Sequence, residues 1–334
     1  MSRTRRKVAV IGTGGTISSI GRDEFDLQDY VTLGKMHDAA GMIEAFPSAS
    51  KAAELIPVAF PVVPSTQMDF AAWARLLELI EEQVATHSDL AGIVILHGTA
   101  SLEETAYALN LTVKTDLPIV LTGAQRPSTG LSTDAAINMA NAVRVAASDE
   151  ARGLGVLVVL NDEIQAAREV TKTSTWRLHT FRSPDFGVLG HVDADQIAIY
   201  RKPVRRLAPD TPFTRADVAN AARVDISYCY AGCDGTAVRA FVAAGAKGIV
   251  SAGFAPGFVS PAEFDALKSA VDQGLVVLQS SRAGSGRVPT MERVAAGGFI
   301  GADNLNPQKA RILLALALNR TNDRAEIAEL IATC

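Results

Sequence analysis

Two apolar segments of this sequence are each followed by a glycine-containing turn and a hydroxyl side chain. The first, Lys7 to Ile11, leads into GTGGTIS with Thr16, and the second, Gly92 to Leu96, leads into HGTASLEETAY with Thr99. Open α/β sheets bind ligands at the C-terminal ends of their strands, so a threonine there could act as a nucleophile in acyl transfer. We therefore expect chemistry at one or both of these strand ends.

Both threonines also have a simpler interpretation as helix caps. Ser101 followed by Glu104 fits a capping box, and Thr99 could satisfy another amide of the same helix. Thr16 could likewise cap the segment that follows it. Capping and catalysis are compatible, because the N-terminus of a helix can face a reaction centre.

The glycine-rich turn after the first segment also suggests a nucleotide site. Counted from Gly12, a dinucleotide fingerprint needs glycine or alanine at position 17, where the chain has Ile17, and no Walker lysine follows. Gly14 and Gly15 are instead expected to let the backbone approach a different ligand closely.

A lysine among hydroxyl residues is the third chemical feature. Lys172 lies in REVTKTSTWRLHTFRSPDFG, after the apolar segment GVLVVLND. A partly desolvated lysine loses some of its preference for the charged form and can serve as a base toward a hydroxyl, whereas an exposed lysine would only be solvated. His97 is one of five scattered histidines without metal-ligand spacing, so we expect it to be structural.

The elements that must position these residues alternate between short apolar runs and amphipathic patterns. Buried strands are expected at Lys7 to Ile11, Gly92 to Leu96, Pro118 to Thr122, Gly155 to Leu160, Gly248 to Ala252 and Leu275 to Gln279. Helices are expected in FAAWARLLELIEEQVA, DAAINMANAVRVAAS, GTAVRAFVAAGA and SPAEFDALKSAVDQG. This alternation predicts an α/β fold with a mainly parallel sheet flanked by helices.

The proline- and charge-rich segment RKPVRRLAPDTPFTRADVANAAR follows a predicted hairpin in VLGHVDADQIAIY. We interpret it as a linker at residues 201–223. It would separate an N-terminal catalytic domain, residues 1–200, from a smaller α/β C-terminal domain, residues 224–334.

Composition excludes several classes of protein. The 334 residues are 48% hydrophobic and 20% charged with a net charge of −4, so neither disorder nor nucleic-acid binding is expected. The basic run SRTRRK lacks the apolar segment of a signal peptide, and no run is long enough for a membrane span, which favours a cytoplasmic protein without a membrane partner. Cys229, Cys233 and Cys334 show neither a zinc pattern nor a disulfide framework, so free thiols are expected.

Five blocks taken in order resemble the bacterial-type L-asparaginase family: GTGGTI, HGTASLEETAYALNL, LTGAQRPSTGLSTDAAINMANAV, REVTKT and LNPQKARILLALAL. The resemblance implies a two-domain α/β subunit in an intimate dimer or tetramer. It also implies hydrolysis of a side-chain amide through a threonine-linked acyl-enzyme, with release of ammonia and without metal or cofactor.

The resemblance assigns roles residue by residue. Thr16 in TGGTI matches the nucleophile, and Tyr30 in DYVTLGK matches a tyrosine from a mobile lid that activates it. Thr99 and Lys172 match a second hydroxyl and a lysine that relay protons or activate water. The implied substrate-binding set is Gly15, Ser65, Thr66, Gly98, Ala100 and Ala124.

Several positions depart from the family pattern. Ala100 stands where the family has an aspartate that binds the substrate α-ammonium, and Thr66 stands where many members have glutamine. The partner-chain loop reads GFAPG, so Phe254 is a candidate in place of a polar loop, and Glu292 nearly matches the partner's glutamate, one position out of register. Removing a charged acceptor from a desolvated site costs on the order of 2 to 5 kcal/mol of binding.

These departures leave alternatives open. The protein could hydrolyse an amide, imide or lactam that lacks the α-ammonium, or it could accept L-asparagine weakly through rearranged contacts. It could also be a non-catalytic sensor on the same fold. The combination of Thr16, Tyr30, Thr99 and Lys172 favours an enzyme, since a binding protein has no need of all four.

Overall fold

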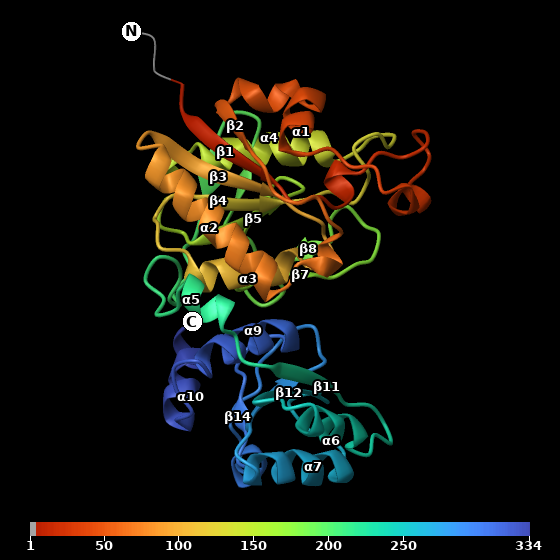
Figure 1. The fold of residues 1–334 in the computed structure, drawn as a ribbon, viewed down its shortest axis with the longest axis vertical. Coiled ribbons are helices and arrows are strands. Elements are labelled where there is room, and N and C mark those ends of the chain that lie inside the picture. Colours follow the sequence, from red (N-terminus) through yellow and green to blue (C-terminus); the bar gives the residue numbers. More distant parts are fainter. Residues whose placement is uncertain (1–4) are drawn as a thin grey trace. The chain divides into compact units, whose positions relative to one another are not determined.

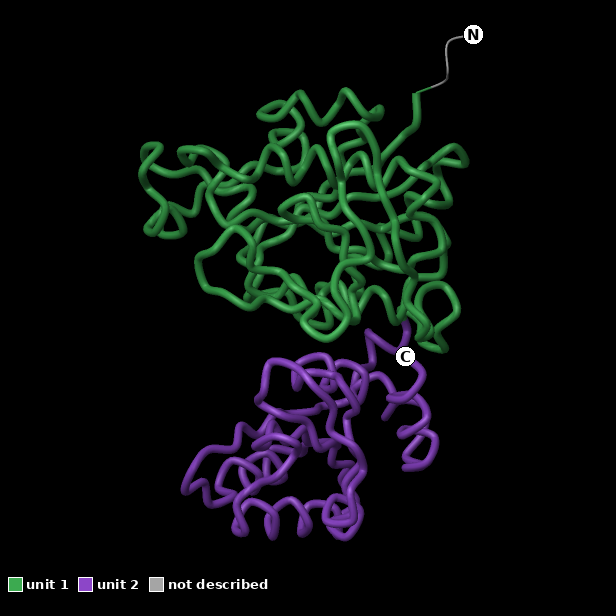
Figure 2. Tube along the Cα trace, turned by 180° about the vertical axis from the view of Figure 1, so that it is seen from behind, with its two compact units in different colours: residues 1–215 green, residues 216–334 purple. Residues whose placement is uncertain are grey.

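The computed structural model describes residues 5–334, so residues 2–4 of the basic run lie outside the described residues. Two compact units divide the chain, the first ending at Arg215 and the second running from Ala216 to Cys334 (Figure 2). Helix α5, Arg215–Ala219, begins at the division. Each unit has a β-sheet of its own.

The first unit contains an eight-stranded sheet with the order β10-β9-β6-β5-β4-β3-β1-β2. Its strands are β1 Lys7–Gly12, β2 Glu54–Val58, β3 Leu90–Leu96, β4 Ile119–Thr122, β5 Val156–Leu160, β6 Glu163–Ala166, β9 Gly190–Val192 and β10 Ile197–Ile199. The five strands from β2 to β5 are parallel, and β6, β9 and β10 extend the sheet in antiparallel pairs. The predicted mainly parallel sheet is confirmed. A separate ribbon pairs β7, Thr171–Lys172, with β8, Phe181–Arg182.

Helices cover both faces of this sheet. Figure 1 shows α1, Ala39–Ala45, and α4, Ala135–Ala146, on one face, and α2, Phe70–Thr86, and α3, Leu102–Thr112, on the other. Strand β3 and the apolar positions of β1 are buried because helices pack on both sides of them. Strands buried on both faces read as continuous apolar runs, which is why the sequence marks them clearly.

The second unit has a parallel four-stranded sheet with the order β11-β12-β13-β14. Its elements are β11 Val224–Tyr228, α6 Thr236–Ala243, β12 Gly248–Gly253, α7 Pro261–Asp272, β13 Val276–Ser281, α8 Glu292–Ala296, β14 Ile300–Gly301, α9 Pro307–Ala317 and α10 Arg324–Thr333. Helices α6 and α7 cover one face of the sheet and α9 the other (Figure 1). None of the helices in residues 5–334 combines the length and the apolarity that crossing a membrane requires.

Helix α4 packs so closely on the sheet that β3 must carry a glycine. A Cβ atom added to Gly92 would lie 2.2 Å from the Ala146 carbonyl oxygen and 2.8 Å from that of Pro118. Both neighbours are backbone atoms, so neither can move away without shifting α4 or β4.

We predict that Gly92→Ala lowers the free energy of unfolding by about 1 to 3 kcal/mol, the usual cost of overpacking. Urea unfolding followed by far-UV circular dichroism measures this loss. Gly284→Ala is the matched control, because a Cβ atom at Gly284 meets nothing within 4 Å. Equal stability of the two variants would contradict the close packing of α4 on β3.

Candidate functional site

The loops that follow β1 and β3 touch through two glycines. Gly15 has a φ of 85°, and a Cβ atom on it would lie 2.1 Å from the Cα atom of Gly98. A Cβ atom on Gly98 would in turn lie 2.7 Å from the side chain of Ser65. Only glycines allow this approach, and it brings the hydroxyl residues after both strands to one place.

A pocket of about 490 Å³ opens at these strand ends. It is lined by Gly15, Thr16, Ser19, Tyr30, Val31, Gly34, Lys35, Met36, Pro64, Ser65, Thr66, Gly98, Thr99, Ala100 and Lys172. The lining comes from four stretches: the turns between β1 and α1, the segment before α2, the β3–α3 loop and β7. Nine of the sequence-predicted site residues are therefore together.

Thr16 and Tyr30 form the first hydrogen-bonded pair of the pocket. Thr16 begins a 3-10 turn, Thr16–Ser18, and its Oγ1 lies 2.8 Å from the Oη of Tyr30, which lies in a second such turn, Asp29–Leu33. Burial raises the pKa of Tyr30, and the hydrogen bond with Thr16 opposes this in part. The phenol therefore stays protonated at neutral pH, so it can pass a proton but carries no standing negative charge.

Thr99 and Lys172 form the second pair. The Nζ of Lys172 donates a hydrogen bond of 2.8 Å to the Oγ1 of Thr99, which is buried. Burial lowers the pKa of Lys172, while the negative charge of Glu103 opposes the shift. Desolvation thus makes it easier for Lys172 to lose its proton than for an exposed lysine, and a general base must be in the unprotonated form.

The predicted capping box at the start of α3 is wrong. Ser101 occupies the N-cap position, but its side chain makes no capping hydrogen bond. Its Oγ donates instead to the carbonyl of Ser65 at 2.6 Å, and the Thr99 hydroxyl accepts from Lys172. The two hydroxyls of this loop therefore do not cap the helix. They connect the β3–α3 loop to the segment before α2 and to β7.

The other predicted binding positions differ in accessibility. Ser65 is 6% exposed, whereas Thr66 and Ala100 are exposed at the pocket wall. Ala124 is fully buried and is not among the lining residues. Its neighbour Gly123 still lies near the site, since a Cβ atom there would be 3.0 Å from the Cγ2 of Thr99.

The two partner-chain candidates belong to the second unit. Phe254 follows β12 and lies under the guanidinium of Arg282, 4.4 Å from its ring centroid. Glu292 is exposed and begins α8. Neither lines the pocket of the first unit.

Sequence reasoning missed several pocket residues, including Ser19, Val31, Lys35 and Met36. Lys35 is the most consequential, because it adds a second ammonium group to the wall. Its only signal was its place in the segment DYVTLGK, five residues after Tyr30.

A buried series of hydrogen bonds connects helix α2 to the β3–α3 loop through Thr105 and His97. The Nε1 of Trp73 donates to Thr105, Thr105 meets the Nε2 of His97 at 2.9 Å, and the Nδ1 of His97 donates to the Gly98 carbonyl at 2.8 Å. Thr105 can donate to Nε2 only if His97 is neutral. Complete burial lowers the pKa of His97 to about 4.

Comparison with known proteins finds relatives that match nearly the full length of the chain. Residues 7–205 match the family model "Asparaginase, N-terminal", and residues 223–331 match "Glutaminase/Asparaginase C-terminal domain". The chain is 40% identical to L-asparaginase 2 of Bacillus subtilis (strain 168) over 320 residues, covering 96% of this chain and 84% of the relative. It is 39% identical to L-asparaginase 2 of Escherichia coli (strain K12) over 326 residues, covering 97% and 92%.

A solved structure agrees in fold. The probable cytoplasmic L-asparaginase from Campylobacter jejuni superposes with a TM-score of 0.93 at 37% identity, covering 99% of this chain and all of that one. Fold and matches together define the class, a hydrolase of amide carbon–nitrogen bonds with a two-domain α/β fold. Within that class, the chain belongs to the bacterial-type L-asparaginase/glutaminase family.

His97 makes folding stability depend on pH. In the unfolded chain its pKa is about 6.5, so between pH 6.5 and pH 4 the unfolded state binds a proton that the native state excludes. Stability is therefore lost as pH falls through this window. We predict a loss of about 3 kcal/mol by pH 4 from this group alone.

Urea unfolding at a series of pH values checks the prediction. His97→Gln is expected to be less stable at pH 7 but to show a shallower decline between pH 6.5 and pH 4. His87→Gln, at the end of α2, is the control and should keep the wild-type slope. Parallel curves for wild type and His97→Gln would contradict the neutral buried imidazole.

Proposed function

We propose that this chain hydrolyses a carboxamide or a related imide or lactam through a threonine acyl-enzyme, with altered substrate specificity. The observation that carries the proposal is that two hydrogen-bonded pairs, Thr16–Tyr30 and Thr99–Lys172, line the same pocket. One pair contains a nucleophile and a proton relay, and the other contains a base beside a hydroxyl. Hydrolysis in two steps needs these parts.

In the first step, the Oγ1 of Thr16 attacks the carbonyl carbon of the amide and loses its proton through Tyr30. Backbone amides of the pocket loops stabilise the oxyanion of the tetrahedral intermediate. The carbon–nitrogen bond then breaks as the nitrogen accepts the proton that Thr16 lost through Tyr30. The nitrogen leaves as ammonia from a carboxamide and stays attached to the opened chain of an imide or lactam. In the second step, water attacks the Thr16 ester and gives a proton to Lys172 by way of Thr99. As the ester carbon–oxygen bond breaks, this proton returns to the Oγ1 of Thr16, which restores the hydroxyl and releases the acid.

The pocket favours a substrate without an ammonium group. Its lining contains two lysines, Lys35 and Lys172, and no aspartate or glutamate among the described residues. Ala100 stands exposed in the wall where the family resemblance implies a carboxylate. A substrate carboxylate can be held by Ser65 and Thr66 in a positive field, whereas an α-ammonium would meet like charge.

L-asparagine is the second candidate substrate. Two of the proteins most similar to this chain are named L-asparaginase 2, at 40% and 39% identity over nearly all of it. In this version the missing counter-ion comes from a second copy of the chain, with Glu292 as the carboxylate and Phe254 beside it. The protein would then act as a dimer or tetramer.

Further features of the proposal rest on the sequence and the family. They are a catalytic domain at residues 1–200, a linker at 201–223, a C-terminal domain at 224–334, a homo-oligomer, and activity without cofactor. A cytoplasmic location is supported by the description of the Campylobacter jejuni relative.

We predict that the wild-type protein releases ammonia from at least one member of a panel, and that Thr16→Ala reduces this release by about 10⁴-fold or more, because no acyl-enzyme can form. The panel comprises L-asparagine, D-asparagine, L-glutamine and succinamate. Opening of cyclic imides, which retain their nitrogen, is followed separately by the loss of imide absorbance. Thr86→Ala, at the exposed end of α2, is the control and should keep full activity. A folded wild-type protein that turns over nothing would sink the enzyme hypothesis.

We also predict that Ala100→Asp raises the ratio of kcat/KM for L-asparagine to that for succinamate by about 10- to 100-fold, the worth of one charged hydrogen bond. Ala100→Asn is the matched control, because it adds a hydrogen-bonding group of the same size without charge. A ratio that fails to rise in Ala100→Asp, or that rises equally in Ala100→Asn, would count against an electrostatic role for this position.

A further inference from the structure

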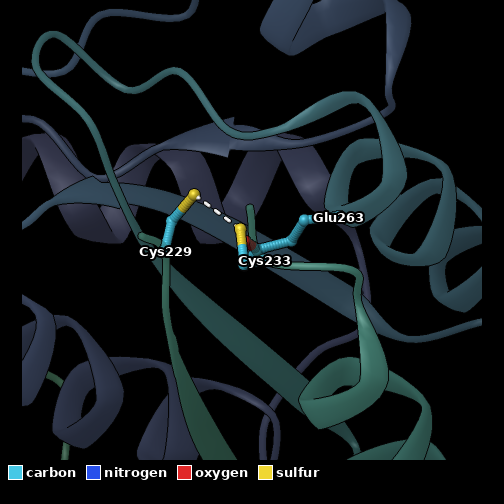
Figure 3. Close-up of side chains that lie close together, drawn as sticks. All are labelled: Cys229, Cys233 and Glu263. Atoms are coloured by element: carbon cyan, nitrogen blue, oxygen red, sulfur yellow. Dashed lines mark hydrogen bonds between the residues drawn. The ribbon is translucent and has the colours of Figure 1, made fainter. Parts of the chain in front are cut away.

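The second unit contains a buried cluster of two cysteines and a glutamate. Cys229 follows β11, Cys233 lies in the loop before α6, and Glu263 is the third residue of α7 (Figure 3). The two sulfur atoms are 3.2 Å apart, and the Sγ of Cys233 lies 2.9 Å from a carboxylate oxygen of Glu263. All three side chains are at most 8% exposed.

The carboxylate of Glu263 is buried, and its hydrogen-bond donors are a hydroxyl and a thiol. The Oγ of Ser227 donates to one of its oxygens at 2.7 Å, and the thiol of Cys233 donates to the other. No ion pair reaches it from any of residues 5–334. A buried carboxylate without a cationic partner is costly, and a cation bound to the cluster would give it such a partner.

We propose that Cys229, Cys233 and Glu263 form a binding site for a thiophilic divalent cation such as Zn²⁺. Two thiolates and one carboxylate are a ligand set that suits zinc and leaves one tetrahedral position open. Binding replaces the two thiol protons with one divalent ion, so the buried site keeps a net charge of −1 before and after. This site is independent of the hydrolytic pocket, which lies in the other unit.

The surroundings of the cluster already orient its ligands. The Cys229 amide donates to the carbonyl of Ala252 on β12, and the Ser260 hydroxyl donates to the carbonyl of Cys233 at 2.7 Å. Ser227 fixes the carboxylate in the manner of an outer-shell hydrogen bond. Tetrahedral zinc would set the sulfur atoms about 3.8 Å apart, so they need to separate by roughly 0.6 Å.

A disulfide between Cys229 and Cys233 is the competing state. It would remove the Cys233 thiol proton that the Glu263 carboxylate accepts, and a buried carboxylate that loses a donor is penalised. A metal ion instead gives that carboxylate a new partner. Binding to two thiols must displace their protons, so metal affinity should increase as pH rises.

Cobalt(II) titration of the reduced, full-length protein tests the proposal. We expect a thiolate-to-cobalt charge-transfer band and tetrahedral visible bands that saturate at one equivalent and disappear when Zn²⁺ is added. Cys229→Ser and Cys233→Ser should lose these bands, and Glu263→Gln should weaken binding by about 10-fold or more. Cys334→Ser is the matched control and should retain them, since this third cysteine lies outside the cluster.

A measurement without variants covers the case in which a substitution prevents folding. Zn²⁺ should protect two cysteines of the wild-type protein from alkylation under native conditions. The proposal is overturned if the fully reduced wild-type protein shows no charge-transfer band, or if the band persists in both Cys229→Ser and Cys233→Ser. The proposal is also overturned if Cys229 and Cys233 are isolated as a disulfide and the protein binds no cobalt after that disulfide is reduced.

Discussion

The contact between Gly15 and Gly98 is the constraint on which the pocket depends. Both loops leave the C-terminal ends of adjacent parallel strands, β1 and β3, so the sheet already brings them to the same edge. A side chain at either glycine would push the loops apart, and Thr16 and Thr99 with them. Backbone bonds then fix the depth of the contact: the Thr13 amide donates to Leu96 at 2.9 Å and the His97 amide to Thr122 at 2.8 Å.

Burial at this contact acts on acid and base together. Desolvation penalises charge of either sign, so it raises the pKa of the Tyr30 phenol and lowers that of the Lys172 ammonium. In water the pKa of a tyrosine phenol lies slightly below that of a lysine ammonium. The two shifts run in opposite directions, and both favour the neutral forms of the two groups, a protonated phenol and a free amine.

Much of the fold was predictable because its central strands are buried on both faces. The runs at β1, β3, β4, β5, β12 and β13 are continuous and apolar, and each forms a strand. Strands β2, β11 and β14 escaped notice because they lie at sheet edges and are short or interrupted by polar residues. A single face in contact with a core leaves a weaker pattern than two faces do.

The site was harder to predict, because hydrogen bonds between distant residues leave no periodic signal. Spacing suggested that Ser101 caps α3, but its hydroxyl is 2.6 Å from the carbonyl of Ser65, thirty-six residues away. The hydroxyl does not cap the helix because it donates instead to the Ser65 carbonyl, which comes within reach only through the close approach of the loops. The cysteine cluster was overlooked for the same reason, since the spacing of Cys229 and Cys233 says nothing of Glu263 on α7.

Two positions support the proposed change in specificity, one in each unit. The family resemblance implies a carboxylate where Ala100 stands and a polar loop where Phe254 stands, and neither of these side chains is polar. Arg282 stacks on that ring and also donates to the Cys229 carbonyl at 3.1 Å, so its own charge is already engaged. The proposed substrate, which keeps its carboxylate and lacks an ammonium group, is compatible with the two lysines, Lys35 and Lys172, that line the pocket.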